Sequence, residues 1–443
     1  MTSAIEEATR GNSWTTETVL LAVSPVLRHL AEHHLRSLID GGETQELSTG
    51  TELVRAGTVT SNLILLVSGT CGVRRGDSES TFEAPAVVGD ISCVAGAPHR
   101  ATVRAVDCAR VLVIDRRRVL EAIHTSAAAG QELTEIVADR LCAPDAVPLV
   151  GRFAIDGVIG EGGSGRVLRA RHPLLGIPIA IKMLSHAHSL SPAGAEAFIR
   201  EASSLVQLEH PGIVRVLDAF EALETFFMVM PWIEGATLRA HLDGKAEFSP
   251  EQILRVADEG LSALSALHAA GLVHRDVKPS NLLINVAGRL VLIDLGIACP
   301  SDGAAPERQL VGSPSYSSPE QILARPVDGR SDVYSLGCTL YELIFGRPPF
   351  EANDIEQAID GHLHGTPSFD LAPNVAMGEP FMRWLARCLS RTRAKRPNAT
   401  TARADLRHLL PSGVVDRPGW QDRPSAAFPV VRETVEWRAL RVD

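Results

Sequence analysis

The feature that most constrains this 443-residue chain is one short polar run between apolar segments. It reads His-Arg-Asp-Val-Lys-Pro-Ser-Asn over residues 274–281, and Asp-Leu-Gly follows at residues 294–296. The two segments bring carboxylates, a lysine and a carboxamide into a stretch short enough for one hairpin. Carboxylate and carboxamide oxygens are ligands that Mg²⁺ accepts in proteins. So many chemically reactive residues in one fixed order indicate a common chemical role rather than chance.

These residue types in this order suit the transfer of the γ-phosphoryl group of ATP to a hydroxyl group. Asp276 would accept the proton of the attacking hydroxyl. Lys278 would neutralise charge on the group being transferred. Asn281 and Asp294 would hold the divalent ions, Mg²⁺ or Mn²⁺, that bridge the phosphates.

Upstream, a glycine-rich segment with the pattern G-x-G-x-x-G-x-V occupies residues 160–167. Its glycines let backbone N–H groups approach phosphate oxygens without a Cβ in the way. Alone, the pattern also fits a dinucleotide-binding turn or a plain hairpin. A dinucleotide site requires a helix directly after the glycines, whereas residues 167–170 have the pattern of a strand. The expected nucleotide-contacting positions of this region are Gly160, Gly162, Gly163, Ser164, Gly165, Val167 and Ala180.

Together these motifs resemble the bacterial Ser/Thr branch of the eukaryotic-like protein kinases, over about residues 150–411. The resemblance implies a two-lobed α+β fold that binds ATP with a divalent metal and phosphorylates Ser or Thr hydroxyls of protein substrates. The spacing of Asp276 and Lys278 is typical of Ser/Thr kinases rather than Tyr kinases.

The resemblance also assigns residues on the nucleotide side of the site. Lys182, at the end of the apolar run 179–182, would contact phosphate, with Glu201 on a following helix as its ion-pair partner. Met230 would line the adenine pocket, and backbone groups near Trp232 would bond to the base. The chain has only four lysines, and two of them are Lys182 and Lys278. A compact ammonium at both positions is what phosphate binding requires.

Further matches to the family are structural or lie beside the reactive loop. Glu320 and Arg396 are expected to form a buried ion pair, and Asp332 is expected to hold the backbone of the 274–281 loop. Ser313 stands where the family usually has Thr, and its hydroxyl is expected to reach the loop at Asp276 and its neighbouring lysine.

Residues 20–142 carry a second pattern, a helix over 25–41, β-rich runs over 45–115 and helical periodicity over 117–141. Within it, residues 88–102, called the cassette below, resemble the phosphate-binding cassette of cyclic-nucleotide-binding domains. The resemblance implies that Asp90 takes the ribose hydroxyl, although the family usually has the longer Glu there. It also implies that Arg100 meets the cyclic phosphate. The remaining expected contacts are Gly89 and Ala101. Alternatives are a β-roll kept for packing or dimerisation, or one that binds a different small ligand.

Composition excludes several classes of protein. The net charge of −10 gives no basic field for nucleic acid. Seven cysteines, an odd number without CxxC spacing, indicate a reducing compartment, so a cytoplasmic location is expected. No uninterrupted apolar stretch reaches the roughly 18 residues of a membrane span.

The sequence therefore predicts an α+β chain in which a helix-flanked β-roll precedes a two-lobed protein kinase. The expected function is Ser/Thr protein phosphorylation regulated by a small-molecule effector, with a cyclic nucleotide as the candidate and a homodimer compatible with the pattern. The alternative is a kinase-fold scaffold whose degenerate β-roll serves assembly. The expected parts are an N-terminal extension (1–19), the β-roll domain (20–142), a linker (143–150), the kinase domain (151–411) and a C-terminal tail (412–443).

Overall fold

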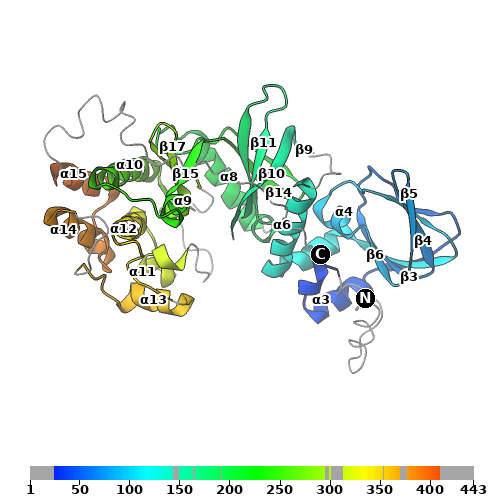
Figure 1. Cartoon of the computed structure of the whole chain (residues 1–443). Coiled ribbons are helices and arrows are strands. Elements are labelled where there is room, and N and C mark those ends of the chain that lie inside the picture. The colour runs from blue at the N-terminus through cyan, green and yellow to red at the C-terminus, as the bar shows by residue number, and fades with distance from the viewer. Residues whose placement is uncertain are drawn as a thin grey trace. The chain divides into compact units, whose positions relative to one another are not determined.

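The structure, a computed structural model, describes residues 24–142, 149–162, 165–190, 192–294, 299–300, 313–352, 354–369 and 377–409. Its chain divides into two compact units, residues 1–200 with 217–230 and residues 201–216 with 231–443 (Figure 1). Among the described helices, none combines the length and the hydrophobicity that crossing a membrane requires. The predicted extension and tail, and residues 143–148 of the predicted linker, lie outside the described residues.

The first unit begins with a β-roll of two four-stranded antiparallel sheets, ordered β1-β8-β3-β6 and β2-β7-β4-β5 (Figure 1). Strand β3 (Asn62–Ser68) is buried on both faces, because successive strand residues point to opposite sides. Leu63 and Leu65 join one hydrophobic core, while Ile64 and Leu66 join another. This explains its unbroken apolar run. The other strands are β1 (Glu43–Leu47), β2 (Glu52–Val54), β4 (Thr70–Arg75), β5 (Ser78–Glu83), β6 (Ala86–Val88), β7 (Thr102–Ala105) and β8 (Ala109–Asp115).

Helices flank the roll in the predicted order, but the first is shorter than expected. Instead of one helix over 25–41, a 3-10 turn η1 (Leu27–His29) precedes α3 (Glu32–Asp40). Leu30 and Ala31 have extended backbones and interrupt the helix between them. The predicted 117–141 helical region is confirmed as two helices. The remaining helices of this part are α4 (Asp90–Ala95), α5 (Arg116–His124) and α6 (Ala127–Cys142).

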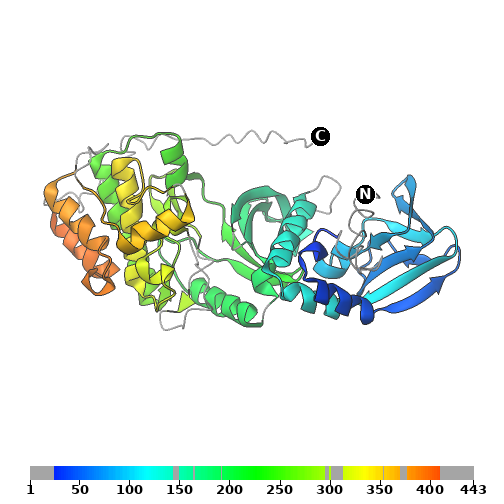
Figure 2. The same ribbon diagram turned by 90° about the horizontal axis from the view of Figure 1, so that it is seen from below.

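The first unit continues into a six-stranded antiparallel sheet with the order β13-β14-β12-β11-β10-β9. The glycine-rich segment forms the β10–β11 hairpin, and a strand rather than a helix follows it, so the dinucleotide-turn alternative is wrong. Helix α6 packs beside this sheet in both views (Figure 1 and Figure 2). The elements are β9 (Leu149–Val150), β10 (Phe153–Gly162), β11 (Gly165–Arg171), β12 (Pro178–Leu184), α7 (His186–Ser189), α8 (Pro192–Val206), β13 (Asp218–Ala222) and β14 (Thr225–Pro231).

The second unit is mainly helical. Ser249 caps the N-terminus of helix α10. Its side chain accepts from the backbone N–H of Gln252, and the Gln252 side chain accepts from the backbone N–H of Ser249, which together form a capping box. Helix α12 is buried along most of its length and forms the centre of this unit. The helices are α9 (Leu238–Asp243), α10 (Pro250–Ala269), η2 (Pro279–Asn281), η3 (Pro314–Tyr316), α11 (Pro319–Ile322), α12 (Gly329–Phe345), α13 (Ile355–His364), α14 (Glu379–Cys388), η4 (Arg393–Lys395) and α15 (Ala399–Leu409). The strands are β15 (Gly235–Thr237), β16 (Leu272–Val273), β17 (Leu282–Asn285), β18 (Leu290–Leu292) and β19 (Cys299–Pro300).

Candidate active site

Asp332, a fully buried residue of α12, binds the backbone of the 274–281 loop. The Asp332 carboxylate accepts hydrogen bonds from the backbone N–H groups of His274 and Arg275, both at 2.8 Å. Its Oδ2 also lies 2.7 Å from Nε2 of His268. Burial alone would raise the pKa of Asp332, but these bonds outweigh it and the pKa is lowered. The predicted role of Asp332 is confirmed.

Arg275 has an unusual backbone conformation at the centre of this loop. Its φ is +68°, in the left-handed region that non-glycine residues seldom adopt. Its N–H is bound by Asp332, and its carbonyl accepts from Gln321 Nε2 at 2.7 Å. Such a conformation persists only where surrounding bonds determine it, and it often marks a functional site.

Asp276 lies at the centre of a tight group of polar side chains. Nζ of Lys278 is 2.8 Å from Oδ2 of Asp276 and also donates to the Ser313 hydroxyl at 2.8 Å. The backbone N–H of Ser313 donates to Oδ1 of Asp276 at 3.2 Å. Asn281 Nδ2 donates to the backbone oxygen of Asp276 at 2.7 Å and to its Oδ2 at 3.1 Å. The predicted base, cation and carboxamide are therefore brought together. The Ser313 hydroxyl contacts Lys278 as expected, whereas Asp276 is bonded to the Ser313 backbone N–H and not to its hydroxyl.

The residues present fit a divalent cation. Because Nδ2 of Asn281 bonds to Asp276, its Oδ1 is the atom that remains as a ligand. The backbone N–H of Ile293 donates to the backbone carbonyl of Asn281 at 3.0 Å. Asp294 is the next residue after Ile293, so this bond ties the chain at Asp294 to Asn281. A carboxylate and a carboxamide oxygen are hard donors of the kind that Mg²⁺ accepts.

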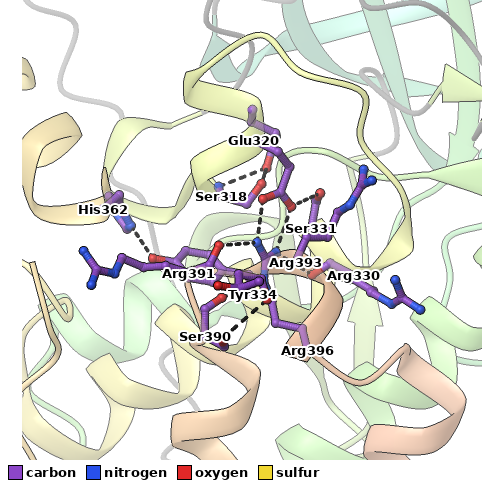
Figure 3. A network of polar contacts seen from close by, with 12 residues as sticks. Ser318, Glu320, Arg330, Ser331, Tyr334, His362, Ser390, Arg391, Arg393 and Arg396 are labelled. Carbon is purple, nitrogen blue, oxygen red and sulfur yellow. Dashed lines mark hydrogen bonds and ion pairs between the residues drawn. The ribbon is translucent and has the colours of Figure 1, made fainter. Parts of the chain in front are cut away.

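An ion pair braces the second unit (Figure 3). Arg396 donates to both carboxylate oxygens of Glu320, through Nη1 at 2.8 Å and through Nη2, and both side chains are buried. Glu320 also accepts from the Ser331 hydroxyl at 2.6 Å. Burial would raise the pKa of Glu320, yet the guanidinium lowers it on balance. The guanidinium also lies over the ring of Tyr334, 4.9 Å from its centroid. The predicted pair is confirmed.

The nucleotide side of the site is described in part. On the β10–β11 hairpin, Gly160 pairs with Val167 and Gly162 with Gly165, and Lys182 on β12 is buried and pairs with Val167. Gly165 has φ +144°, and a Cβ there would lie 1.9 Å from the carbonyl oxygen of Met183, so only glycine fits.

For the other predicted nucleotide contacts, the structure gives the strand and the burial. Ala180 is half-buried on β12, Met230 is buried on β14, and Trp232 is half-buried. Gly163, Ser164 and residues 295–298 lie outside the described residues, and so does the side chain of Glu201. The Lys182–Glu201 pair therefore stays a prediction.

Comparison with known families decides what this arrangement is. A protein kinase domain model matches residues 153–406, more than half of the chain. The chain belongs to the protein kinase family. A second model, the cyclic nucleotide-binding domain, matches residues 44–126 of this kinase. The predicted combination of the two domains is confirmed, and the six-stranded sheet is therefore the small lobe.

Curated relatives of the kinase are bacterial. The serine/threonine-protein kinase PknB of Mycobacterium leprae is 37% identical over 211 residues, covering 46% of this chain and 34% of that protein. PrkC of Bacillus subtilis is 35% identical over 221 residues, covering 49% of this chain and 34% of that protein. The probable kinase PknB of Corynebacterium glutamicum is 35% identical over 243 residues, covering 52% and 38% respectively. The chain thus spans little more than a third of the length of these relatives.

In the N-terminal domain, the cassette contains the short helix α4. Gly89 has φ +77° and precedes α4, the first residue of which is Asp90. Oδ1 of Asp90 accepts from the backbone N–H of Ile91 at 2.8 Å. Burial raises the pKa of Asp90 despite this bond. Ala101 is half-buried where the chain enters β7.

The two basic residues of the cassette have unequal surroundings. The guanidinium of Arg100, the predicted phosphate contact, donates to the backbone carbonyl of Arg140 in α6 at 3.0 Å. The neighbouring His99 is buried instead, 3.1 Å from the Thr60 hydroxyl. A Cβ on Gly89 would lie 2.8 Å from Cε1 of His99. His99 is thus the basic residue packed against the turn before α4, and the sequence prediction did not include it.

Burial and the nearby Arg140 lower the pKa of His99, so the ring is neutral at neutral pH. The sequence offered little signal for its place. His99 and Arg100 are adjacent in the sequence, and the sequence pattern does not tell which of the two side chains faces inward. Only the three-dimensional pairing of Gly57 and Thr58 with the backbone of His99 decides which one faces inward.

Proposed function

We propose that this chain is an ATP-dependent protein kinase that phosphorylates Ser or Thr side chains of protein substrates. The observation that carries the proposal is the buried Asp276, bonded to Lys278, Asn281 and Ser313 within one loop. The relatives named as serine/threonine-protein kinases support the same substrate class.

The geometry assigns each residue a task. The Asp276 carboxylate, oriented by the Ser313 N–H and by Asn281, would accept the proton of the substrate hydroxyl as it attacks the γ-phosphorus. Lys278, held between Asp276 and the Ser313 hydroxyl, would stabilise the charge on the transferring phosphoryl group. Asn281 and Asp294 would hold Mg²⁺ or Mn²⁺, which when bound neutralises charge on the phosphates. On the small lobe, Lys182 and the β10–β11 hairpin would position ATP.

The competing function is a kinase-fold scaffold without catalysis. A scaffold has no use for a buried carboxylate whose neighbours are the cation and carboxamide that phosphoryl transfer requires. Burying a charged carboxylate costs free energy. In a chain without catalysis, nothing would offset this cost, and replacement of Asp276 would be tolerated. The scaffold is therefore the less favoured alternative.

The test is transfer of radiolabelled phosphate from Mg·ATP to acceptor peptides that differ only in a Ser, Thr or Tyr acceptor. We expect labelling of the Ser and Thr peptides, and a fall in kcat of about 10²- to 10⁴-fold for Asp276→Asn. Asp243→Asn, an exposed carboxylate that pairs with Arg239, is the matched control and should keep its activity. Undiminished labelling by Asp276→Asn would refute the assignment.

We further propose that the N-terminal domain is a regulatory module for a small-molecule effector, with cAMP and cGMP as the first ligands to test. The family match over residues 44–126 and the α4 cassette support this. Calorimetry without heat for either nucleotide at high protein concentration would direct the search to another ligand class. A cytoplasmic location is likewise proposed, since the six cysteines whose side chains the structure describes are all free thiols. A homodimer, which the sequence pattern allows, stays a prediction.

A further inference from the structure

The N-terminal domain and the small lobe share one hydrophobic core within the first unit. The core runs from α3, α5 and α6 into strands β10, β11, β12 and β14. Leu133 and Val137 of α6 belong to it together with Leu168 of β11 and Ile181 of β12, and all four are buried. Helix α6 therefore packs directly against the strands on which ATP binding is expected.

Helices α6 and α7 lie in close contact. A Cβ on Gly130 of α6 would lie 2.6 Å from backbone atoms of Ala187, so only glycine allows this packing. One turn further on, the Thr134 hydroxyl accepts from the backbone N–H of His186 at 2.8 Å and lies 3.0 Å from Nδ1 of the same ring. Glycine within a helix lowers helix stability, so its presence here indicates that close contact is needed.

His186 is completed by a bond on its other side. Nε2 lies 2.9 Å from the backbone carbonyl of Leu223, which can only accept. Nε2 therefore carries the proton, and the unprotonated Nδ1 faces the Thr134 hydroxyl, which itself donates to the Gly130 carbonyl at 2.9 Å. Burial lowers the pKa of His186 to about 4, consistent with this neutral tautomer. The ring links α6 to the turn between β13 and β14.

A second contact reaches the glycine-rich hairpin. Nη2 of Arg166, which directly follows Gly165, lies 3.0 Å from Oε1 of Glu135, the residue after Thr134 in α6. The Arg166 side chain is 9% exposed, so this pair is partly shielded from water and is worth more than an exposed one. Helix α6 thus contacts the hairpin at its last glycine.

A third contact joins the cassette to the β13–β14 turn. Arg116 donates through Nε to the carbonyl of Cys93 in α4, and its Nη2 lies 2.8 Å from Oε1 of Glu224. Leu223 and Glu224 have φ of +52° and +59°, a conformation that costs free energy in non-glycine residues. Backbone strain of this kind is kept where surrounding contacts impose it, and it is common at switch regions.

We propose that Arg116, Thr134 and Glu135 are positioning residues of the ATP site, supplied by the regulatory domain. We call their contacts with Glu224, His186 and Arg166 the α6 joint. Lys182 lies on β12, and only Ser185 separates that strand from α7. A shift of α6 or α4 would therefore move the strand of Lys182 and the glycine-rich hairpin together. The inference rests on the proposed function, because it concerns the nucleotide site of that kinase.

The joint acts on nucleotide affinity rather than on chemistry. Its contacts all lie in the first unit, whereas Asp276, Lys278 and Asn281 lie in the second. Uncoupling the joint should therefore raise Kd and KM for the nucleotide and change kcat much less. By thermodynamic reciprocity, a nucleotide bound at the site must in turn change the stability of α6.

The test uses the full chain with Mg·ADP as the probe and Thr134→Val as the main variant. Valine keeps the shape of threonine but removes the hydroxyl that pairs with His186. We expect the Kd for Mg·ADP, measured by calorimetry, and the KM for ATP to rise roughly tenfold, with kcat within about threefold. Thr134→Ser, which restores the hydroxyl, should return both values to within about threefold of the wild type. An unchanged Kd in Thr134→Val, or a loss confined to kcat, would overturn the inference.

Hydrogen exchange gives a readout that does not depend on activity. We expect Mg·ADP to slow exchange over residues 130–138 of α6 in the wild type and not in Thr134→Val. Arg104→Gln is the control for a change outside the α6 joint. It removes an ion pair within the β-roll, in which Nη2 of Arg104 lies 2.9 Å from Oε2 of Glu52. It should behave as the wild type. Nucleotide binding without any change in α6 would overturn the inference, whereas wild-type protein that does not bind Mg·ADP would overturn the proposed function itself.

Should Thr134→Val fail to fold, the partly exposed pair of Arg116 and Glu224 offers a second route. We expect Arg116→Gln and Glu224→Gln each to raise the Kd for Mg·ADP about threefold, and the double variant to do no more than either. Additive effects, or none, would show that the pair does not position the site.

Discussion

The catalytic loop and the cassette differ in how their charged side chains are held. In the loop, Asp276 and Lys278 bond to each other and to Ser313, and Asp332 fixes the backbone from a buried helix. In the cassette, the guanidinium of Arg100 bonds to a carbonyl of α6 instead. The comparison teaches that the predicted catalytic side chains bond to one another, whereas Arg100 of the cassette bonds to the backbone of α6.

The largest expected effect tests how firmly the second unit is braced. Arg396→Met leaves Glu320 buried without its cation, so the free energy of unfolding should fall by about 3–5 kcal/mol. Native-state hydrogen exchange in α12 measures it. Arg407→Met is the control: Asp258 keeps its bond to Arg403, and the loss should stay below about 1 kcal/mol. Equal losses in the two variants would mean that the buried pair is not the brace.

Acid should reveal a sensitive histidine in each unit, His186 in the first and His362 in the second, both with pKa lowered by burial to about 4. The unfolded chain binds protons near pH 6.5 and the folded chain does not. Stability is therefore present above that pH and is lost as the pH falls, by up to about 3 kcal/mol per histidine at pH 4. His186→Gln should flatten the pH dependence of the first unit alone. A flattened profile in both units would contradict their independence.

Two glycines of the β10–β11 hairpin differ in the space around them, and their substitutions test whether the shape of the hairpin matters. Gly165→Ala places a Cβ against the Met183 carbonyl at an unfavourable φ, so we expect a loss of about 2 kcal/mol and weaker ATP binding. Gly157→Ala meets nothing within 4 Å and should change stability by less than about 1 kcal/mol. Thermal unfolding with and without Mg·ADP measures both. Similar outcomes for the two would argue against a shaped phosphate loop.

The smallest effect concerns Ser313. Its hydroxyl accepts from Lys278, so Ser313→Ala should lower kcat about tenfold or less, while Ser313→Thr keeps the hydroxyl and the rate. Steady-state kinetics with one Ser peptide is sufficient. If Ser313→Thr loses as much as Ser313→Ala, shape rather than the hydrogen bond matters at this position.

The catalytic loop could be predicted from sequence because its chemistry is local. Residues 274–281 are neighbours in the chain, and their types alone specify the roles that the geometry then assembles. The long-range braces, Glu320 with Arg396 and Asp332 with the loop, could be predicted only through the family resemblance. The β-roll followed from its alternation of strands and turns.

The α6 joint could not be predicted in this way. Thr134 and His186 lie far apart in the chain, and neither belongs to a motif. Nothing in the sequence pattern around Gly130 distinguishes a glycine needed for a close contact from one that only weakens a helix. The described contacts between the β-roll domain and the small lobe include α6, and residues 143–148 of the predicted linker lie outside the described residues. The choice between His99 and Arg100 likewise depends on backbone pairing that no local pattern records.

The continuous core beneath α6 has a consequence for exchanging modules. The two family matches end and begin at residues 126 and 153, yet α6 lies between them and its apolar side chains pack into the small lobe. A chimera cut at residue 153 would remove α6 and expose the apolar face of this lobe to water, whereas a cut at residue 126 would keep α6. A different sensor could therefore be grafted onto this kinase only if the cut kept α6 or if the sensor brought a helix with the same small and apolar residues facing β10 and α7.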